Sequence, residues 1–152
     1  MKLFIGFLVV IICLILGNLL SLKYSERKRF YRDFCDFNER LIQEVAYSQN
    51  TINHLLNDCP STCFYQSVKN NILEKKSLDK VNFLTENEFD FFKDYLSKLG
   101  KSDKSTQLNF LTYSSSGLYK LKNDSEGEEK KYKSLYLKMS FLIGLIILII
   151  LL

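Results

Sequence analysis

The sequence predicts an all-α protein, an antiparallel helical bundle flanked by an N-terminal and a C-terminal transmembrane helix. Uncharged apolar runs occupy Leu3 to Leu20 and Met139 to Leu152, and about 18 apolar residues are enough to span a membrane. Between these runs, apolar residues recur at steps of three and four, which is the period of an amphipathic helix. We therefore expect a membrane anchor at 1–22, a cytoplasmic helical domain at 23–134 and a second membrane helix at 135–152.

The first apolar run must be distinguished from a cleaved signal peptide. A signal peptide has an apolar core of about 7–15 residues followed by a small-residue cleavage site. The run here is longer, and Asn18-Leu19-Leu20-Ser21 stands where an Ala-x-Ala pattern would be needed. Cys13 is not preceded by a small residue, which argues against a lipoprotein cleavage site. We expect an uncleaved anchor.

The second run is shorter, but Leu135, Tyr136 and Leu137 extend it if Lys138 reaches the membrane surface. Tyr132 and Tyr136 lie where aromatic side chains commonly line a membrane interface. The alternative is a buried core helix, but the run has no polar face at any helical rotation. We expect a second span.

Basic residues flank the inner ends of both runs and predict the orientation. Lys and Arg concentrate on the cytoplasmic side of membrane spans, so the middle domain is expected in the cytoplasm and both termini outside. The same residues are expected to contact anionic lipid headgroups, at about 1 kcal/mol each. They are Lys23, Arg27, Lys28, Arg29, Arg32, Lys130, Lys131, Lys133 and Lys138.

The rest of the composition excludes several classes of protein. The net charge of +4 comes from the membrane flanks, so we expect no nucleic-acid partner. His54, Cys59 and Cys63 have a loose metal-ligand spacing, but no fourth ligand is evident, and thiols stay reduced in the cytosol. No phosphate-binding loop, metalloprotease motif or nucleophile elbow is present. We expect no enzyme activity, no metal or cofactor, and no small-molecule substrate.

The middle domain begins with a helix predicted from about Ser25 to Leu56, which either starts there or continues from the first span. Its apolar stripe is Phe30, Phe34, Phe37, Leu41, Val45, Ser48, Ile52 and Leu55. Its polar face is predicted to carry Arg32, Asp33, Glu39, Arg40 and Gln43. After Asn57-Asp58-Cys59-Pro60, a short helix is expected to begin with Pro60 in its first turn and to end in the Lys75-Lys76-Ser77 region. Its inner face is Phe64, Val68 and Ile72.

A capping box gives the clearest local signal. Thr85 is the predicted N-cap with Glu88 three residues later, and Leu84 and Phe89 flank the box at the staple positions. The buried stripe of this helix is Phe89, Phe92, Leu96 and Leu99. Gly100 is expected to end the helix.

The last helix is expected to be long and to run toward the second span. Ser102 or Asp103 caps it, and its apolar stripe is Leu108, Leu111, Ser115 and Leu118. Gly117 and Gly127 weaken it. The segment Ser125-Glu126-Gly127 is a candidate break before the membrane.

Several scattered segments together resemble one family. In order, they are Tyr24-Ser25-Glu26-Arg27, Glu44-Val45-Ala46-Tyr47, Leu99-Gly100-Lys101-Ser102-Asp103 with Gln107, and Lys131-Tyr132-Lys133-Ser134-Leu135 before a span containing Gly144. This order, over essentially the whole chain, resembles the stage III sporulation protein AB family. Asn50-Thr51-Ile52 departs from the Thr-Pro-Leu that the family tends to show, and Tyr136 replaces a family glycine.

The resemblance implies a non-enzymatic part of the secretion-like channel complex between mother cell and forespore in endospore-forming bacteria. It implies a soluble domain similar to the cytoplasmic helical domains of the type II secretion platform protein. The expected partners are the sporulation ATPase, on the mother-cell side of the outer forespore membrane, and other components of the complex. Glu44, Tyr47, Asp103 and Gln107 are expected to form part of the partner-binding surface, although these residues can also serve the fold alone.

Two other functions remain open from the sequence. One is a two-span sensor whose middle domain binds a small ligand, which would be expected to lie outside the cell. The other is a membrane-surface organising protein that binds lipid without a specific ATPase partner.

Overall fold

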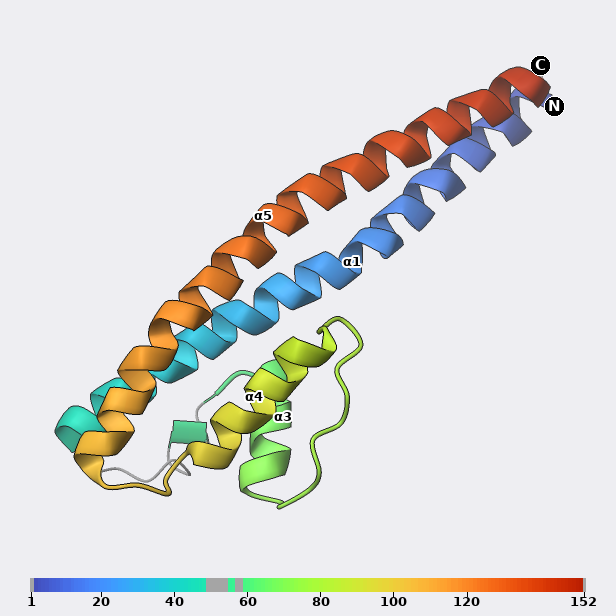
Figure 1. Ribbon diagram of the computed structural model, residues 1–152. Helices are drawn as coiled ribbons and strands as arrows, with labels where there is room; N and C mark the ends of the chain where they lie inside the picture. Colours follow the sequence, from blue (N-terminus) through green and yellow to red (C-terminus); the bar gives the residue numbers. More distant parts are fainter. Residues whose placement is uncertain (1, 49–54, 57–58, 152) are drawn as a thin grey trace. The chain divides into compact units, whose positions relative to one another are not determined.

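The structure is a computed structural model that describes residues 2–48, 55–56 and 59–151, and it is helical in every element of that part (Figure 1). The elements are α1 (Lys2–Gln43), η1 (Glu44–Ser48), α3 (Cys63–Ile72), α4 (Glu86–Lys98) and α5 (Lys104–Leu151). The predicted fold class is confirmed. The first helix continues from the apolar run, which was one of the two alternatives considered.

The chain divides into two compact units. One consists of Met1–Lys28 with Asp124–Leu152, here called the two-helix unit, and the other is Arg29–Asn123, here called the bundle unit. This division follows contacts between residues. The predicted boundaries at 22 and 135 follow hydropathy, so they remain predictions about where the membrane begins.

In the two-helix unit, the N-terminal part of α1 and the C-terminal part of α5 run antiparallel side by side (Figure 1). Two glycines allow their close approach. A Cβ atom on Gly17 would lie 2.0 Å from Ser140 Oγ, and one on Gly144 would lie 3.2 Å from Val10 Cα. Small residues at such crossings are typical of packed membrane helices.

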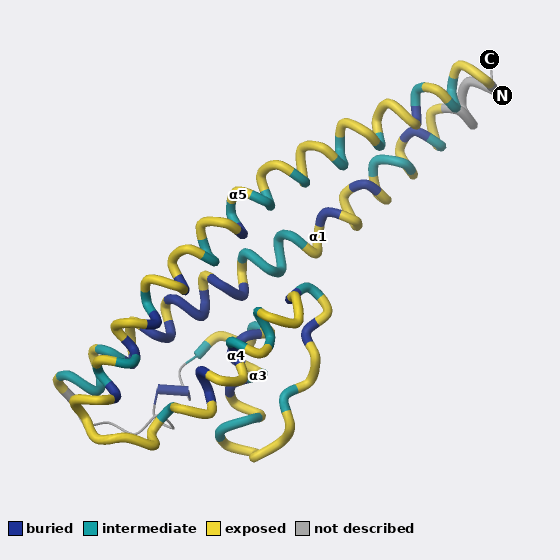
Figure 2. Tube along the Cα trace, viewed as in Figure 1, coloured by how far each residue is buried: buried dark blue, intermediate teal, exposed yellow. Residues whose placement is uncertain are grey.

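The apolar faces of this helix pair are largely uncovered. Only 17% of the most apolar segment of the first helix and 6% of that of the second is buried within the chain. Figure 2 shows the corresponding exposed stretches toward the two chain ends. A core helix of a soluble protein is mostly buried, so this exposure disfavours the buried-core alternative. Both helices are long and apolar enough to cross a membrane.

The core of the bundle unit is built from aromatic rings on α1, α3 and α4. The ring of Phe34 lies 5.0 Å from that of Phe64 and 5.4 Å from that of Phe92, and Phe30 lies 5.3 Å from Phe64. Each such pair adds about 0.5–1.5 kcal/mol beyond the burial of its area. The predicted stripe is confirmed where it is buried, at Phe30, Phe34, Phe37, Leu41 and Leu55. Val45 is half-buried, and the side chains of Ser48 and Ile52 lie outside the described residues.

Asn38 joins three helices of the bundle unit. The Tyr95 hydroxyl on α4 donates to Asn38 Oδ1 at 2.7 Å. Asn38 Nδ2 donates to the Leu111 carbonyl at 3.2 Å and to Ser115 Oγ at 2.8 Å, both on α5. Asn38 is 1% exposed. Because a buried amide with satisfied bonds favours one arrangement of its neighbours, this network fixes the register of α1, α4 and α5.

The capping predictions for α4 are confirmed. Glu88 N donates to Thr85 Oγ1 at 3.4 Å, and Thr85 N donates to a Glu88 carboxylate oxygen at 2.9 Å. Gly100 follows the C-cap residue Leu99 and has φ of 69°, a left-handed conformation that glycine adopts without a steric penalty.

The short helix α3 differs from its prediction at both ends. Its N-cap residue is Thr62, so the prediction that Pro60 lies in its first turn is wrong. The Pro60 carbonyl instead accepts a bond from Thr62 N at 2.8 Å, which shapes the turn before the helix. The helix ends at Ile72, ahead of the predicted Lys75-Lys76-Ser77 region, where Lys75 has φ of 51° and belongs to a turn.

Two predictions for the long helices are also wrong. The α-helical part of α1 ends at Gln43 and widens into the π-helical turn η1, so it does not continue to Leu56 as one α-helix. The helix α5 passes through Ser125-Glu126-Gly127 without a break. Ser125 is 1% exposed, and packing here outweighs the cost of about 1 kcal/mol for a glycine within a helix.

Asp33 is a further correction. The sequence places it on the polar face of α1, but it is 5% exposed. Its neighbour Arg32 remains exposed, with one guanidinium nitrogen 3.5 Å from Asp33 Oδ1. The α1 helix in the bundle unit is therefore covered over a wider arc than its apolar stripe indicates.

Candidate functional site

Three of the four predicted partner-binding residues lie at one end of the bundle unit. Lys104 Nζ, at the start of α5, donates to the Ala46 carbonyl of η1 at 3.0 Å. This bond brings the η1 turn beside the turn between α4 and α5. We call this region the partner end and define it as Glu44, Tyr47, Lys101, Asp103 and Lys104.

Tyr47 is an exposed aromatic side chain of the partner end. It is 89% exposed, whereas Glu44, about one helical turn earlier, is half-buried. A tyrosine costs little conformational entropy to immobilise and is enriched among residues that dominate protein interfaces. Tyr47 is therefore accessible, and its contact with a partner remains a prediction.

The fourth predicted residue, Gln107, is not at the surface. It is 6% exposed, so the expectation that it faces a partner as an exposed side chain is wrong. Gln107 Oε1 accepts hydrogen bonds from Gly100 N at 3.2 Å and from Ser102 Oγ at 3.1 Å. The buried Gln107 side chain therefore stabilises the conformation of the α4–α5 turn, and it positions Lys101 and Asp103.

Asp103 serves the fold and the surface together. Its carboxylate accepts hydrogen bonds from the Ser105 hydroxyl and from Thr106 N, the latter at 3.2 Å, which caps the N-terminus of α5. These bonds hold the pKa of the Asp103 carboxyl well below its usual range, so it is ionised at neutral pH. Because Asp103 is exposed, this negative charge remains accessible.

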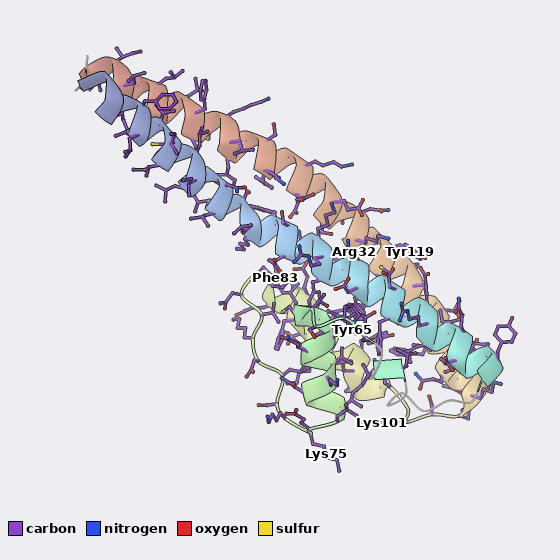
Figure 3. All side chains as sticks on the ribbon, turned by 180° about the vertical axis from the view of Figure 1, so that it is seen from behind. Arg32, Tyr65, Lys75, Phe83, Lys101 and Tyr119 are labelled. Carbon is purple, nitrogen blue, oxygen red and sulfur yellow. The ribbon has the colours of Figure 1, made fainter. Side chains whose placement is uncertain are left out.

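Lys101 is not among the residues that the sequence predicts to bind a partner. It is exposed in the same turn (Figure 3) and forms no ion pair with any described residue. Its signal in the sequence was its place between Gly100, which ends one helix, and Asp103, which caps the next. The partner end thus offers an aromatic ring, an accessible ammonium group and carboxylates on a fixed backbone.

A second feature lies in the two-helix unit, where predicted lipid-binding residues meet acidic ones. Arg27 forms an ion pair with Glu128. Lys28 Nζ lies 3.0 Å from one oxygen of Glu129, and Ser25 Oγ donates to the other at 3.0 Å. The bond from Lys28 is the main cause that lowers the pKa of Glu129. Glu128 and Glu129 were not predicted to take part, because nothing local in the sequence indicates their partners.

Tyrosines accompany these ion pairs. Tyr24 stacks on Tyr132 with ring centroids 4.5 Å apart and approaches Tyr136 at 6.1 Å. Lys131 Nζ lies 5.6 Å from the centroid of the Tyr132 ring. The cluster links α1 and α5 through charge and aromatic stacking.

The predicted headgroup residues therefore divide into two groups. Arg27 and Lys28 have acidic partners on α5. The others are exposed, and they are Lys23, Arg29, Arg32, Lys130, Lys131, Lys133 and Lys138. These side chains are accessible, and their contact with anionic headgroups remains a prediction.

The described residues add no support to the metal-ligand spacing of His54, Cys59 and Cys63. His54 lies outside them. Cys59 is half-buried, with its thiol 3.0 Å from the Leu55 carbonyl, and Cys63 is exposed at the start of α3.

Comparison with known proteins identifies the family. The family model for stage III sporulation protein AB matches residues 2–152. No curated protein and no solved structure matches the chain significantly. The match spans both apolar helices, the bundle unit and the partner end, as the order of the scattered segments predicts. The chain therefore belongs to the stage III sporulation protein AB family.

Proposed function

We propose that this protein is a non-enzymatic membrane platform of the channel complex between mother cell and forespore, and that it recruits the sporulation ATPase. The bundle unit lies in the mother-cell cytoplasm, and the two-helix unit anchors it in the outer forespore membrane. The observation that carries the proposal is the partner end, where Tyr47 is 89% exposed beside the turn that presents Lys101 and Asp103.

Hydrogen bonds hold the partner end together, which suits it to binding. The Lys104 bond to the Ala46 carbonyl ties η1 to α5, and Gln107 fixes the α4–α5 turn. A surface that is ordered before binding loses less conformational entropy when a partner docks.

The test is co-purification of the full-length chain, in detergent micelles, with the ATPase of the same complex. Tyr47→Ala should weaken binding at least about tenfold, as expected for a central interface tyrosine. Tyr113→Ala is the matched control, because Tyr113 is 83% exposed on α5 but lies outside the partner end. Full recovery of the ATPase by Tyr47→Ala and Lys101→Ala would overturn the proposed surface.

The proposed orientation has its own test. An impermeant thiol reagent applied to intact cells should leave Cys63 unlabelled, because the bundle unit is proposed to be cytoplasmic. Cys63 is the informative thiol since it is exposed, whereas Cys35 is 2% exposed and is protected by burial in either orientation. Labelling of Cys63 from outside would reverse the topology and remove the ATPase from reach.

The sensor alternative has one observation in its favour. A hollow of about 280 Å³ in the bundle unit is lined by Asn71, Ser77, Leu78, Phe89, Lys93 and Ser97. The hollow is open and small beside typical ligand sites of about 300–1,000 Å³. A sensor is expected to place the bundle unit outside the cell, so labelling of Cys63 from outside would favour that function. The lipid-organiser alternative predicts no stoichiometric complex with the ATPase.

A further inference from the structure

Asn18 is a polar side chain within the first apolar run that has no hydrogen-bond partner among the described residues. It is exposed. Its side chain makes no hydrogen bond with any described residue, and only its backbone carbonyl accepts one, from Ser21 Oγ at 2.7 Å. An amide that faces lipid without a hydrogen-bond partner is unfavourable, because no water is present to replace the missing bonds.

Asn18 is part of a regular exposed stripe. Leu8, Ile11, Ile15, Asn18 and Leu22 follow one another at steps of three, four, three and four residues. The four apolar members are 48%, 44%, 54% and 46% exposed. This spacing places them on one face of the helix, as in a coiled coil. We call this face the Asn18 stripe.

The Asn18 stripe differs from the face of α1 that packs on α5. That face carries Gly17, which adjoins Ser140, and Val10, which adjoins Gly144. Neighbouring residues on a helix are separated by about 100°, so Asn18 is turned away from the face that carries Gly17. The α1 helix thus has one face covered by α5. The Asn18 stripe lies on the remaining surface, which is uncovered in a single chain and also includes Ile12, Leu16 and Leu19.

We propose that the Asn18 stripe pairs with the same stripe of a second copy of this chain, with the two Asn18 side chains hydrogen-bonded to each other. A carboxamide has both donors and acceptors, so two identical amides can satisfy one another. Copies that insert with one topology are parallel and carry Asn18 at the same depth. A single polar residue in an apolar three-four stripe also fixes the register of a helix pair.

This pairing does not depend on the ATPase. It requires only that the first apolar run lies in a membrane, so it stands or falls separately from the proposed recruiting function. If both hold, a paired α1 would present two partner ends to the channel complex.

The test uses the full-length chain in vesicles of phosphatidylethanolamine and phosphatidylglycerol. Donor and acceptor dyes on the exposed Cys63 report association through energy transfer as the protein-to-lipid ratio rises. Asn18→Leu should weaken association roughly 3- to 30-fold, the range measured for hydrogen bonds between membrane helices. The double variant Asn18→Leu with Leu19→Asn keeps the composition but moves the amide off the stripe, and it should not restore the association.

Disulfide cross-linking maps the paired face. In a background without Cys13, the Ile15→Cys variant should cross-link to its own copy under mild oxidation, and the Leu16→Cys variant should not. The proposal is overturned if wild-type chains do not associate with one another in the vesicles. It is also overturned if the Asn18→Leu variant associates as tightly as wild type, or if positions 15 and 16 cross-link equally. The first of these outcomes would assign Asn18 to contact with the lipid surface or with another membrane protein.

Discussion

Removing the Asn38 side chain is expected to loosen the bundle unit at the point where three helices meet. In the Asn38→Ala variant, the Tyr95 hydroxyl loses its acceptor while it remains buried. Burial holds the pKa of Tyr95 well above its usual range, so this hydroxyl stays protonated and still needs an acceptor. A buried donor left unsatisfied costs about 1–3 kcal/mol.

The two bonds from Asn38 Nδ2 are lost as well. Each contributes about 0.5–1.5 kcal/mol. The Leu111 carbonyl is not left without a partner, because Ser115 Oγ donates to it at 3.1 Å. The sum is a loss of roughly 2–6 kcal/mol in the free energy of unfolding of the bundle unit.

The assay is urea unfolding of the full chain in mild detergent, followed by tyrosine fluorescence because the chain contains no tryptophan. Ser116→Ala is the control. Its exposed hydroxyl bonds the Tyr113 carbonyl and no other described group, so the variant should change stability by less than about 0.5 kcal/mol. In a double-mutant cycle with Tyr95→Phe, which removes the stranded hydroxyl, the two effects should be non-additive by about 1–3 kcal/mol. Additive effects, or an Asn38→Ala variant as stable as Ser116→Ala, would refute the account of the network.

Three further predictions concern single contacts. Thr85→Ala should lower the stability of the bundle unit by about 1 kcal/mol in the same urea assay, whereas Thr85→Ser should retain most of it. Gly17→Ala should weaken the pairing of α1 with α5, since its Cβ would collide with Ser140; adding Ser140→Gly should restore part of that pairing, as measured by limited proteolysis in vesicles. Acid should weaken the same pairing, because the pKa of Glu129 is lowered from its ordinary value of 4.5. The contribution of ionised Glu129 to the stability of the helix pair is complete above pH 4.5 and is lost as the pH falls through the lowered pKa. Glu129→Gln should be less stable at neutral pH but lose little more in acid, and an unchanged acid response in that variant would exclude Glu129 as the cause.

The sequence predicts the local features of this fold well, because their causes lie within a few residues. The capping box at Thr85 and the helix end at Gly100 depend on side chains one turn apart. The aromatic stripe from Phe30 to Leu41 follows from helical periodicity alone. The two apolar runs follow from composition.

The features that the sequence does not predict depend on contacts between distant segments. Periodicity gives no sign that Asp33 is buried, since its cover comes from elsewhere in the fold. The sequence predicts that Gln107 is exposed because it is polar. In the structure its side chain is buried by the turn at Gly100, whose backbone N–H donates to it. The glycine at position 127 suggests a break, and only the contacts of α5 with α1 show why the helix continues. The sequence predicts three residues of the partner end, namely Glu44, Tyr47 and Asp103. It does not predict that η1 lies beside the α4–α5 turn, because that contact depends on the bond from Lys104 to the Ala46 carbonyl.

The ion pairs of the two-helix unit have a consequence for biogenesis. Ser25 and Glu129 are separated by 104 positions, and Arg27 and Glu128 by 101. During synthesis the first apolar helix therefore emerges long before its acidic partners exist. The contacts of the bundle unit close shorter loops, such as the 57 positions between Asn38 and Tyr95, and can form first. Until Glu128 and Glu129 are translated, Arg27 and Lys28 lack these carboxylates, and anionic lipid is the other partner that we predict for them. Their exchange of lipid for Glu128 and Glu129 would then mark the completion of the helix pair.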